Sequence, residues 1–396
     1  MATARFAELG NRDRHTRPRR QRHPARVRLV CRCSRSDRVP AGGGAGRLTR
    51  RKRHRAVRDR ALSRPVIPGH GKILVVRGGA IGDFIVTLPV FAALRRQFPG
   101  THLEVLGYPH IAPLAAAGRL VDTVCSIEAR ALAGFFARGG GLDERLANYF
   151  AGFALIISFL FDPDGIFQEN VTRCSKAQFI AGPHRPDEKL NLHATEALLK
   201  PLERLTIFDA DPVPRLRLVA PASSGQVARL PGREATRGSE ASEPAGKDVC
   251  ATDRWLALHP GSGSERKNWP EENWRCLLQH LQSATKFHFL LVGGEAEGDR
   301  LQRLSSDLAT TRIQLAQSLP LVELAWRLHQ CAGFIGHDSG ISHLAAALGL
   351  PGLVLWGETN QAIWCPRGDR ITVLTSNGGI AGVTVGDVVA EVRSRL

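Results

Sequence analysis

The stretch of residues 72–88 reads KILVVRGGAIGDFIVTL and decides the fold. It opens with an uninterrupted apolar run, residues 73–76, which is typical of a parallel strand covered on both faces. The glycines that follow allow a tight turn and leave backbone amides open to a ligand. A helix is expected over residues 84–97, so Asp83 would project from the carboxyl end of the strand, where open α/β sheets bind ligands. Asp is also a good helix cap, so this stretch alone leaves a capping role and a catalytic role open.

The same alternation of strand and helix recurs along the rest of the chain. The expected strands are residues 73–77, 102–107, 121–127, 153–161, 178–181, 255–259, 288–293, 313–315, 333–336, 353–356 and 370–375. The expected helices are residues 84–97, 110–117, 142–151, 192–205, 271–281, 300–309, 321–331, 341–348 and 385–396. Such alternation indicates βαβ units around parallel sheets.

A polar segment divides this pattern in two. Residues 220–253 are rich in Pro, Gly, Ser and charge, which predicts a linker or a long insertion. We therefore expect an N-terminal Rossmann-like domain over residues 69–219 and a second one over residues 254–396. Two doubly wound domains of this kind would face each other across a cleft, with ligands bound between them.

The excess positive charge lies at the start of the chain. The net charge is +17; residues 1–68 carry 21 Lys and Arg against four acidic residues, and the remainder carries 33 of each sign. The composition of residues 1–68 predicts a disordered extension. It allows an arm that binds nucleic acid or anionic lipid, but it lacks the apolar core of a secretory signal. The account that we favour is that the extension is not native: Met1 is the only methionine, and translation from a valine such as Val66 would explain why the first expected strand begins only at residue 73.

The eight cysteines form no C-x-x-C pair, which argues against a zinc site or a disulfide framework. We expect reduced thiols in a cytoplasmic protein. No apolar run reaches the roughly 18 residues of a membrane span, and attachment to a membrane surface stays open.

Three glycine-rich turns in the second half could carry chemistry. The first, HPGSGSERKNWP (residues 259–270), offers backbone amides, the hydroxyls of Ser262 and Ser264, and the charge of Lys267, which together suit a phosphate group. The second, GGEAE (residues 293–297), places Glu295 where it could accept hydrogen bonds from a ribose or a base. Each of these two segments is equally compatible with an ordinary turn or helix entry.

The third turn, GHDSGISHLAAA (residues 336–347), is the most specific. Asp338, Ser339 and Gly340 open a helix whose amide end suits a diphosphate, and His343 lies one turn further on the same side. The alternative is a purely structural role, in which Ser339 caps the helix and His343 lies at the surface. Nucleophilic hydrolysis is not expected, since G-x-S-x-G is absent. A Walker loop and a GxGxxG fingerprint are absent too, which weakens the case for a P-loop enzyme or a dehydrogenase.

Together the segments RGGAIGDFIVTLP, HPGSGSERKNWPEENW and GHDSGISHLAAALGLPGLVLWGETN resemble glycosyltransferase family 9, the lipopolysaccharide heptosyltransferases and their relatives. The resemblance implies the two-domain GT-B fold and inverting transfer without a metal or cofactor. It implies Asp83 as the catalytic base and Lys267 as a second catalytic residue that contacts the diphosphate. The donor-binding residues that it implies are Gly82, Thr87, Ser262, Ser264, Glu295, Asp338, Ser339, Gly340 and His343.

The function expected from the resemblance is transfer of heptose or a related sugar from an ADP-heptose-like donor to lipopolysaccharide or another surface glycan. The expected partners are a nucleotide sugar and a glycolipid or glycan acceptor, met in the cytoplasm or at the cytoplasmic face of the inner membrane. Two alternatives remain. A nucleotide-sugar epimerase of the same architecture would form product from the donor alone. A nucleic-acid-binding protein would depend on residues 1–68 and on low salt.

Overall fold

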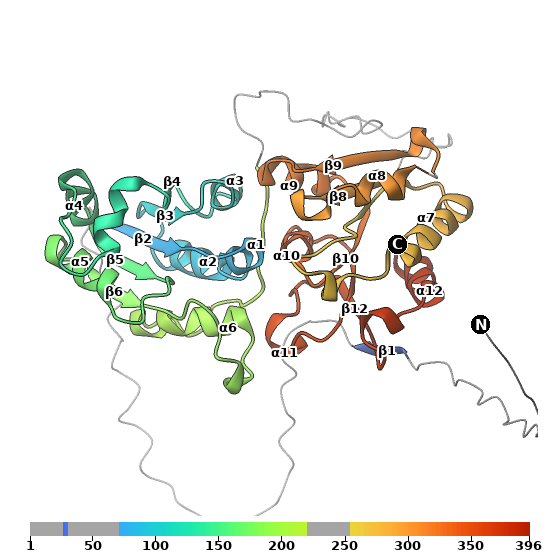
Figure 1. Cartoon of the computed structure of the whole chain (residues 1–396). Coiled ribbons are helices and arrows are strands. Elements are labelled where there is room, and N and C mark those ends of the chain that lie inside the picture. Colours follow the sequence, from blue (N-terminus) through green and yellow to red (C-terminus); the bar gives the residue numbers. More distant parts are fainter. Residues whose placement is uncertain (1–26, 31–70, 220–253, 307) are drawn as a thin grey trace, which may run out of the picture.

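The computed structural model describes residues 27–30, 71–219, 254–306 and 308–396 (Figure 1). Within these residues it has two α/β domains, each built on a sheet of mostly parallel strands. The expectations for residues 220–253, and those for residues 1–68 apart from 27–30, lie outside the described residues. We refer below to residues 71–219 as the N-terminal domain and to residues 254–396 as the C-terminal domain.

The N-terminal domain is built on a five-stranded parallel sheet with the order β4-β3-β2-β5-β6. Its strands are β2 (Lys72–Arg77), β3 (Leu103–Gly107), β4 (Thr123–Ser126), β5 (Phe153–Ser158) and β6 (Gln178–Ala181). Its helices are α1 (Ile81–Ile85), α2 (Leu88–Gln97), α3 (Pro113–Ala117), α4 (Glu144–Ala151), α5 (Ile166–Cys174) and α6 (Ala194–Leu199), with 3₁₀ turns η1 (Arg130–Phe136), η2 (Glu188–Leu190) and η3 (Lys200–Leu205).

Strand β2 shows why this sheet is covered on both faces. Ile73 and Val75 pack with residues of α2, α3 and α6, whereas Leu74 and Val76 pack with residues of η1, α4 and α5. Successive side chains of a strand point to opposite faces, so an ungapped apolar run needs a layer of helices on each side. The central position of β2 places the turn that follows it at the middle of the sheet's carboxyl edge.

The C-terminal domain is built on a seven-stranded sheet with the order β1-β12-β11-β10-β7-β8-β9. Its parallel strands are β7 (Trp255–Leu258), β8 (His288–Gly293), β9 (Ile313–Gln317), β10 (Gly333–His337), β11 (Gly352–Leu355) and β12 (Ile371–Ser376). Its helices are α7 (Glu271–Ala284), α8 (Arg300–Ser305), α9 (Leu321–His329), α10 (Gly340–Ala347), α11 (Gln361–Trp364) and α12 (Val385–Arg395), with 3₁₀ turns η4 (Glu265–Lys267), η5 (Glu295–Glu297), η6 (Thr310–Arg312) and η7 (Ile380–Gly382).

Strand β1 (Val27–Val30) corrects one expectation from the sequence. We expected all of residues 1–68 to be disordered, but VRLV pairs antiparallel with β12 at the edge of the second sheet. An edge strand exposes a row of unpaired backbone donors and acceptors, and a short segment rich in β-branched residues can satisfy them. Local composition hid this pairing because it depends on a strand more than 300 residues away in sequence.

Two further differences concern helices. The helix expected over residues 84–97 is interrupted after α1 and starts again at α2, with Thr87 as its N-cap and Pro89 in its first turn. Proline suits a first turn because its missing N–H has no intrahelical partner there. The short helices α5 and α11 were not expected from the sequence.

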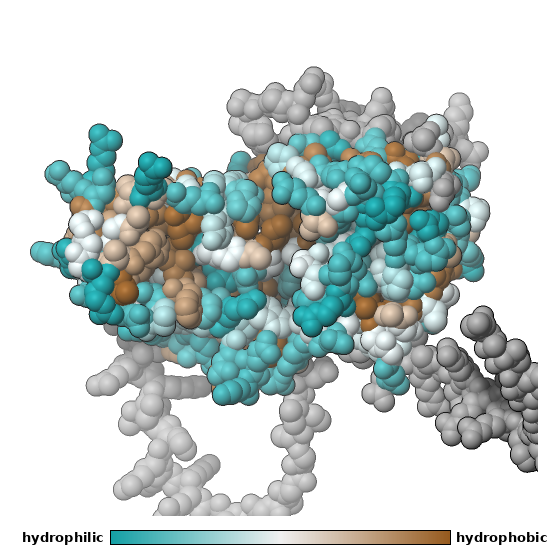
Figure 2. Space-filling model, viewed as in Figure 1, coloured by the Kyte–Doolittle hydropathy of each residue, from teal (hydrophilic) through white to brown (hydrophobic). Residues whose placement is uncertain are grey.

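The two domains meet where α1 of the first lies beside α10 of the second (Figure 1). The two helices pack closely at Gly340, because a Cβ added to this residue would lie only 2.7 Å from Ile81 Cβ. A second contact between the domains is the hydrogen bond that Arg367 Nη2 donates to Glu196 Oε1 over 2.7 Å. Figure 2 shows the boundary as a hollow between the domains with hydrophilic residues along its rim. No helix among the described residues is long and apolar enough to span a bilayer.

Candidate functional site

Asp83 lies in α1, directly after the glycine turn that ends β2. Its Oδ2 accepts a hydrogen bond from the Ala80 N–H over 2.9 Å, so the carboxylate does cap the start of α1. Its Oδ1 lies 3.7 Å from Arg77 Nη2, and the side chain is 15% exposed. Asp83 therefore caps α1 through Oδ2, while its Oδ1 lies near the Arg77 guanidinium.

The Arg77 side chain is hydrogen-bonded to the backbone of Asp83. Its Nε and Nη2 donate to the Asp83 carbonyl over 3.2 and 2.9 Å, and its Nη1 donates to the His184 carbonyl over 2.8 Å. Burial lowers the pKa of Arg77 to about 10 because loss of water disfavours the charged form, while nearby Asp83 acts in the opposite direction. We did not single out Arg77 from the sequence; the signal was a charged residue at the end of an otherwise apolar strand.

Thr87 does not lie where the resemblance implied a donor contact. It is fully buried, and its Oγ1 donates to the Asp83 carbonyl over 2.8 Å. It lines none of the three cavities described below. Its place in the structure is that of a residue that positions Asp83.

Three cavities adjoin Asp83 or the residues around it. The central cavity has a volume of about 370 Å³ and lies between the domains. The C-terminal-side cavity has a volume of about 970 Å³ and the N-terminal-side cavity one of about 570 Å³.

The central cavity brings together residues that are far apart in the sequence. Its lining includes seven residues expected at the site, which are Gly82, Asp83, Lys267, Asp338, Ser339, Gly340 and His343. Lys267 Nζ lies 2.7 Å from Asp338 Oδ2, so the lysine charge is paired with a carboxylate from the neighbouring turn. The start of α10 adds the partial positive charge of a helix N-terminus.

The start of α10 is held by a buried polar cluster. Ser339 caps the helix by accepting from the Ser342 N–H, and its Oγ lies 3.2 Å from His259 Nδ1. Burial lowers the pKa of His343 to about 4, partly offset by Asp338 and Asp83. His343 is therefore neutral at pH 7. A Cβ added at Gly82 would lie 3.5 Å from the His343 ring, which shows how closely the two domains approach.

His337 fixes the glycine-rich turn after β7. Its Nε2 accepts from the Trp269 N–H over 3.0 Å, so its own proton is on Nδ1, which faces the Gly261 carbonyl at 3.2 Å. Burial lowers the pKa of His337 to about 3, which keeps the ring in this neutral form. The turn that carries Ser262 and Lys267 is thus anchored to β10.

Ser262 and Glu295, two of the residues expected to bind the donor, line the C-terminal-side cavity. Glu295 is exposed, and the Ser262 hydroxyl donates to the Ser264 carbonyl over 2.8 Å. Ser264 itself is not among the residues that line any of the three cavities. The cavity has many apolar lining residues, including Val292, Leu319, Leu321, Val322, Leu324 and Ile341.

Glu297 is a buried carboxylate of this cavity that we did not select from the sequence. Its Oε2 accepts from the Gly294 N–H over 2.6 Å, and its Oε1 lies 3.8 Å from His259 Nε2. Gly261 makes room for it, since a Cβ added there would overlap the carboxylate. The segment GGEAE contains two glutamates after its glycines, and the sequence alone does not show which of them is buried. In the structure it is Glu297.

The N-terminal-side cavity is lined by aromatic and basic side chains next to Asp83. The aromatic residues are Tyr108, Phe136, Phe159 and Phe161, and the basic ones are Arg77, His184 and Arg185. Phe161 is 69% exposed and lies edge-on against the His184 ring at 4.6 Å between centroids. Aromatic faces of this kind suit the apolar face of a sugar ring or another flat, partly apolar group.

Among the described residues, no group of three or more His, Cys, Asp or Glu side chains is arranged to hold a metal ion. The described cysteines, which are Cys125, Cys174, Cys276, Cys331 and Cys365, are free thiols.

Comparison with known proteins bears on the second half of the chain most directly. Residues 220–381 match the family model described as glycosyltransferase family 9 (heptosyltransferase). The matched residues include most of the C-terminal domain. The chain is also 31% identical, over 124 residues, to lipopolysaccharide heptosyltransferase 1 of Escherichia coli O18:K1:H7. That match covers 28% of this chain and 36% of that relative, so the chain aligns with about a third of the relative's length.

Solved structures extend the similarity of the fold to both domains. The glycosyl transferase family 9 protein of Veillonella parvula DSM 2008 aligns with a TM-score of 0.62 at 17% identity, covering 83% of this chain and 98% of that protein. E. coli heptosyltransferase WaaC with ADP aligns with a TM-score of 0.59 at 17% identity, covering 82% of this chain and all of that protein. The expected GT-B fold is therefore confirmed.

Proposed function

We propose that the protein is an inverting, metal-independent glycosyltransferase that moves heptose or a related sugar from an ADP-heptose-like donor to lipopolysaccharide or another surface glycan. The observation that carries this proposal is the position of Asp83. It lines both the central cavity and the N-terminal-side cavity, so one carboxylate faces two ligand spaces. A transferase that joins two substrates needs a base at the point where they meet.

The donor would occupy the C-terminal-side and central cavities. The apolar walls of the first suit a nucleoside, and Glu297, which also lines it, can accept hydrogen bonds from ribose hydroxyls. The second places Lys267 and the amide end of α10 around a diphosphate. Binding of ADP by E. coli WaaC, which shares the fold, supports an ADP-linked donor here.

The acceptor would occupy the N-terminal-side cavity, with its reacting hydroxyl directed at Asp83. In the reaction, the acceptor oxygen bonds to the anomeric carbon from the side opposite the diphosphate, and the bond from that carbon to the phosphate oxygen breaks. Asp83 takes the hydroxyl proton, and the nucleoside diphosphate leaves with the bonding electron pair. Lys267 and the α10 amides stabilise the charge that develops on the leaving group.

The direct test uses ADP-heptose with lipopolysaccharide from a heptose-deficient strain. We expect ADP release that requires the acceptor, and a glycosidic product whose anomeric configuration, read by NMR, is inverted. EDTA should leave the rate unchanged. Product formed from the donor alone would indicate the epimerase instead, and no turnover with retained ADP binding would assign another acceptor or sugar.

We further propose that transfer takes place in the cytoplasm, with the protein touching the inner membrane surface where a lipid-linked acceptor would be presented. Co-sedimentation with vesicles that contain lipopolysaccharide tests this contact. Equal binding to vesicles with and without the glycolipid would argue against acceptor-directed attachment.

A further inference from the structure

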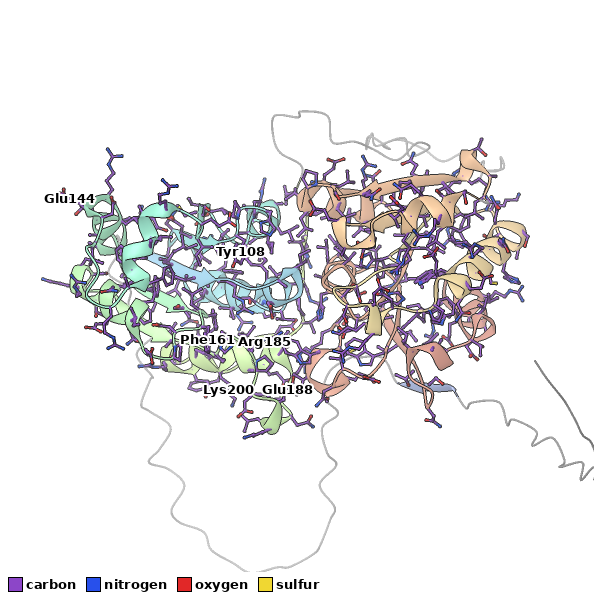
Figure 3. The ribbon with its side chains drawn as sticks, viewed as in Figure 1. Tyr108, Glu144, Phe161, Arg185, Glu188 and Lys200 are labelled. Atoms are coloured by element: carbon purple, nitrogen blue, oxygen red, sulfur yellow. The ribbon has the colours of Figure 1, made fainter. Side chains whose placement is uncertain are left out.

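Two side chains line both the central cavity and the N-terminal-side cavity: Asp83 and Arg185. The boundary between the two spaces is therefore marked by one carboxylate and one guanidinium. Arg185 lies at the edge of the N-terminal domain that faces the C-terminal domain, close to Phe161 and Glu188 (Figure 3). Nothing in the sequence around Arg185 pointed to a ligand.

Arg185 is supported by the opposite domain. Its guanidinium carbon lies 5.8 Å from the centre of the Trp364 ring, which is within the range of a cation–π contact. The Trp364 indole N–H in turn donates to Glu188 Oε1 over 3.2 Å. Trp364 of α11 thus contacts two residues of one short segment of the N-terminal domain, Arg185 and Glu188.

The other cations near Asp83 are already engaged. Lys267 is paired with Asp338, and Arg77 is buried with its donors on the carbonyls of Asp83, Phe159 and His184. Arg185, by contrast, is exposed and has no hydrogen bond or ion pair with any described residue. A guanidinium has five N–H donors in a planar fork that matches a carboxylate or a phosphate.

We propose that Arg185 binds an oxyanion of the substrates at the junction of the two cavities, and that Trp364 positions it there. This inference rests on the proposed function and adds to it a residue from the acceptor-side domain. The oxyanion is either a phosphate of the nucleoside diphosphate or an acidic group on the acceptor; both are recognised by the same guanidinium chemistry.

The test compares Arg185→Ala and Arg185→Lys with the control Arg204→Ala, which removes an exposed arginine that lines none of the three cavities. ADP affinity is measured by calorimetry on the full chain, and acceptor kcat/KM by initial rates with saturating ADP-heptose. Loss of a charged hydrogen bond should weaken one of these two quantities by about 10- to 100-fold in Arg185→Ala, with partial recovery in Arg185→Lys. Arg204→Ala should match the parent protein.

The two arms distinguish the sources of the oxyanion. A loss of ADP affinity, mirrored by weaker inhibition by inorganic pyrophosphate, assigns the phosphate; a loss of acceptor kcat/KM at unchanged ADP affinity assigns the acidic acceptor group. Trp364→Leu should lower the same quantity, and the effects of the two changes should be less than additive in the double variant. Parent-like values of both quantities in Arg185→Ala would overturn the inference. The ADP arm is read without turnover, so it separates this failure from a failure of the proposed transfer activity.

Discussion

Gly340 of α10 lies so close to Gly82 of α1 that a Cβ added to Gly340 would come within 2.9 Å of the Gly82 backbone nitrogen. This contact joins the two domains at the residue that precedes Asp83. The distance between Asp83 and the start of α10 is thus set by the Gly82 backbone and the Ile81 side chain, which both pack against Gly340. Domain packing and the placement of the carboxylate are therefore coupled.

Gly340→Ala should force α1 and α10 apart and displace Asp83. Misplacement of a reacting group by about 1 Å can cost about 100-fold in rate, so we expect kcat to fall by about 10- to 100-fold. ADP affinity should change far less, since the amide of residue 340 is retained. Steady-state kinetics and calorimetry check this, with Gly386→Ala as the control because a Cβ there meets nothing closer than 3.7 Å. A parent-like kcat in Gly340→Ala would show that the domain contact does not set the position of Asp83.

Thr87→Val should affect stability and leave nucleotide affinity unchanged. The substitution removes the hydroxyl that bonds the Asp83 carbonyl, at a cost of about 1 kcal/mol in the free energy of unfolding. Thr172→Val is the matched control, because its hydroxyl makes the same kind of bond to the Glu169 carbonyl at an exposed site. Urea denaturation and ADP titration provide the two readouts. A tenfold weaker ADP affinity at unchanged stability would restore the donor-binding role that the resemblance implied.

Glu297 and Glu295 should differ sharply as nucleotide contacts. Glu297 lines the C-terminal-side cavity and is buried, whereas Glu295 is exposed. We expect Glu297→Gln to weaken ADP binding by about tenfold, as is usual when a charged hydrogen-bond acceptor is neutralised, and Glu295→Gln to change it less than about twofold. The same titrations with adenosine and with adenine isolate the ribose contribution, because these two ligands differ only by the ribose. The reverse order of effects would assign the ribose contact to Glu295.

The buried histidines predict how stability depends on pH. Burial lowers the pKa of His259 and His343 to about 4, and that of His193 and His337 to about 3. An unfolded histidine has a pKa of about 6.5, so below that pH the unfolded chain binds protons that the folded chain does not. The free energy of unfolding should therefore fall as the pH drops from about 6.5 to about 4, by about 1.4 kcal/mol per pH unit for each histidine, and stay level with respect to them above about 6.5.

Urea denaturation at several pH values measures that slope. His343→Gln should reduce it by the share of one histidine. An unaltered slope in His343→Gln would mean that His343 is not held neutral in the folded protein.

Local sequence was sufficient for features that depend on neighbouring residues. The ungapped run before Gly78 predicted β2, and the strands expected over residues 178–181 and 288–293 were found with the same bounds. The glycine turns led to Asp83, Lys267 and Ser339 because each combines a strand end, small residues and a polar group. All three line the central cavity.

Features that depend on contacts between distant parts of the chain could not be predicted from the sequence. Arg185 and Trp364 meet only when the two domains pack, and nothing nearby in sequence marks either residue. Which glutamate of GGEAE faces inward depends on the space left by Gly261, more than 30 residues earlier. The resemblance assigned Thr87 to the donor site, but in the structure Thr87 is buried and its hydroxyl donates to the Asp83 carbonyl.

The rate of sugar transfer by Asp83→Asn tests the central claim most directly. Asparagine can still accept the Ala80 N–H and cap α1, so the substitution removes the base without removing the cap. We predict a fall in kcat of about 10²- to 10⁴-fold, with ADP affinity within about threefold of the parent protein. A transfer rate within about tenfold of the parent, at unchanged ADP affinity, would contradict the assignment of Asp83 as the base.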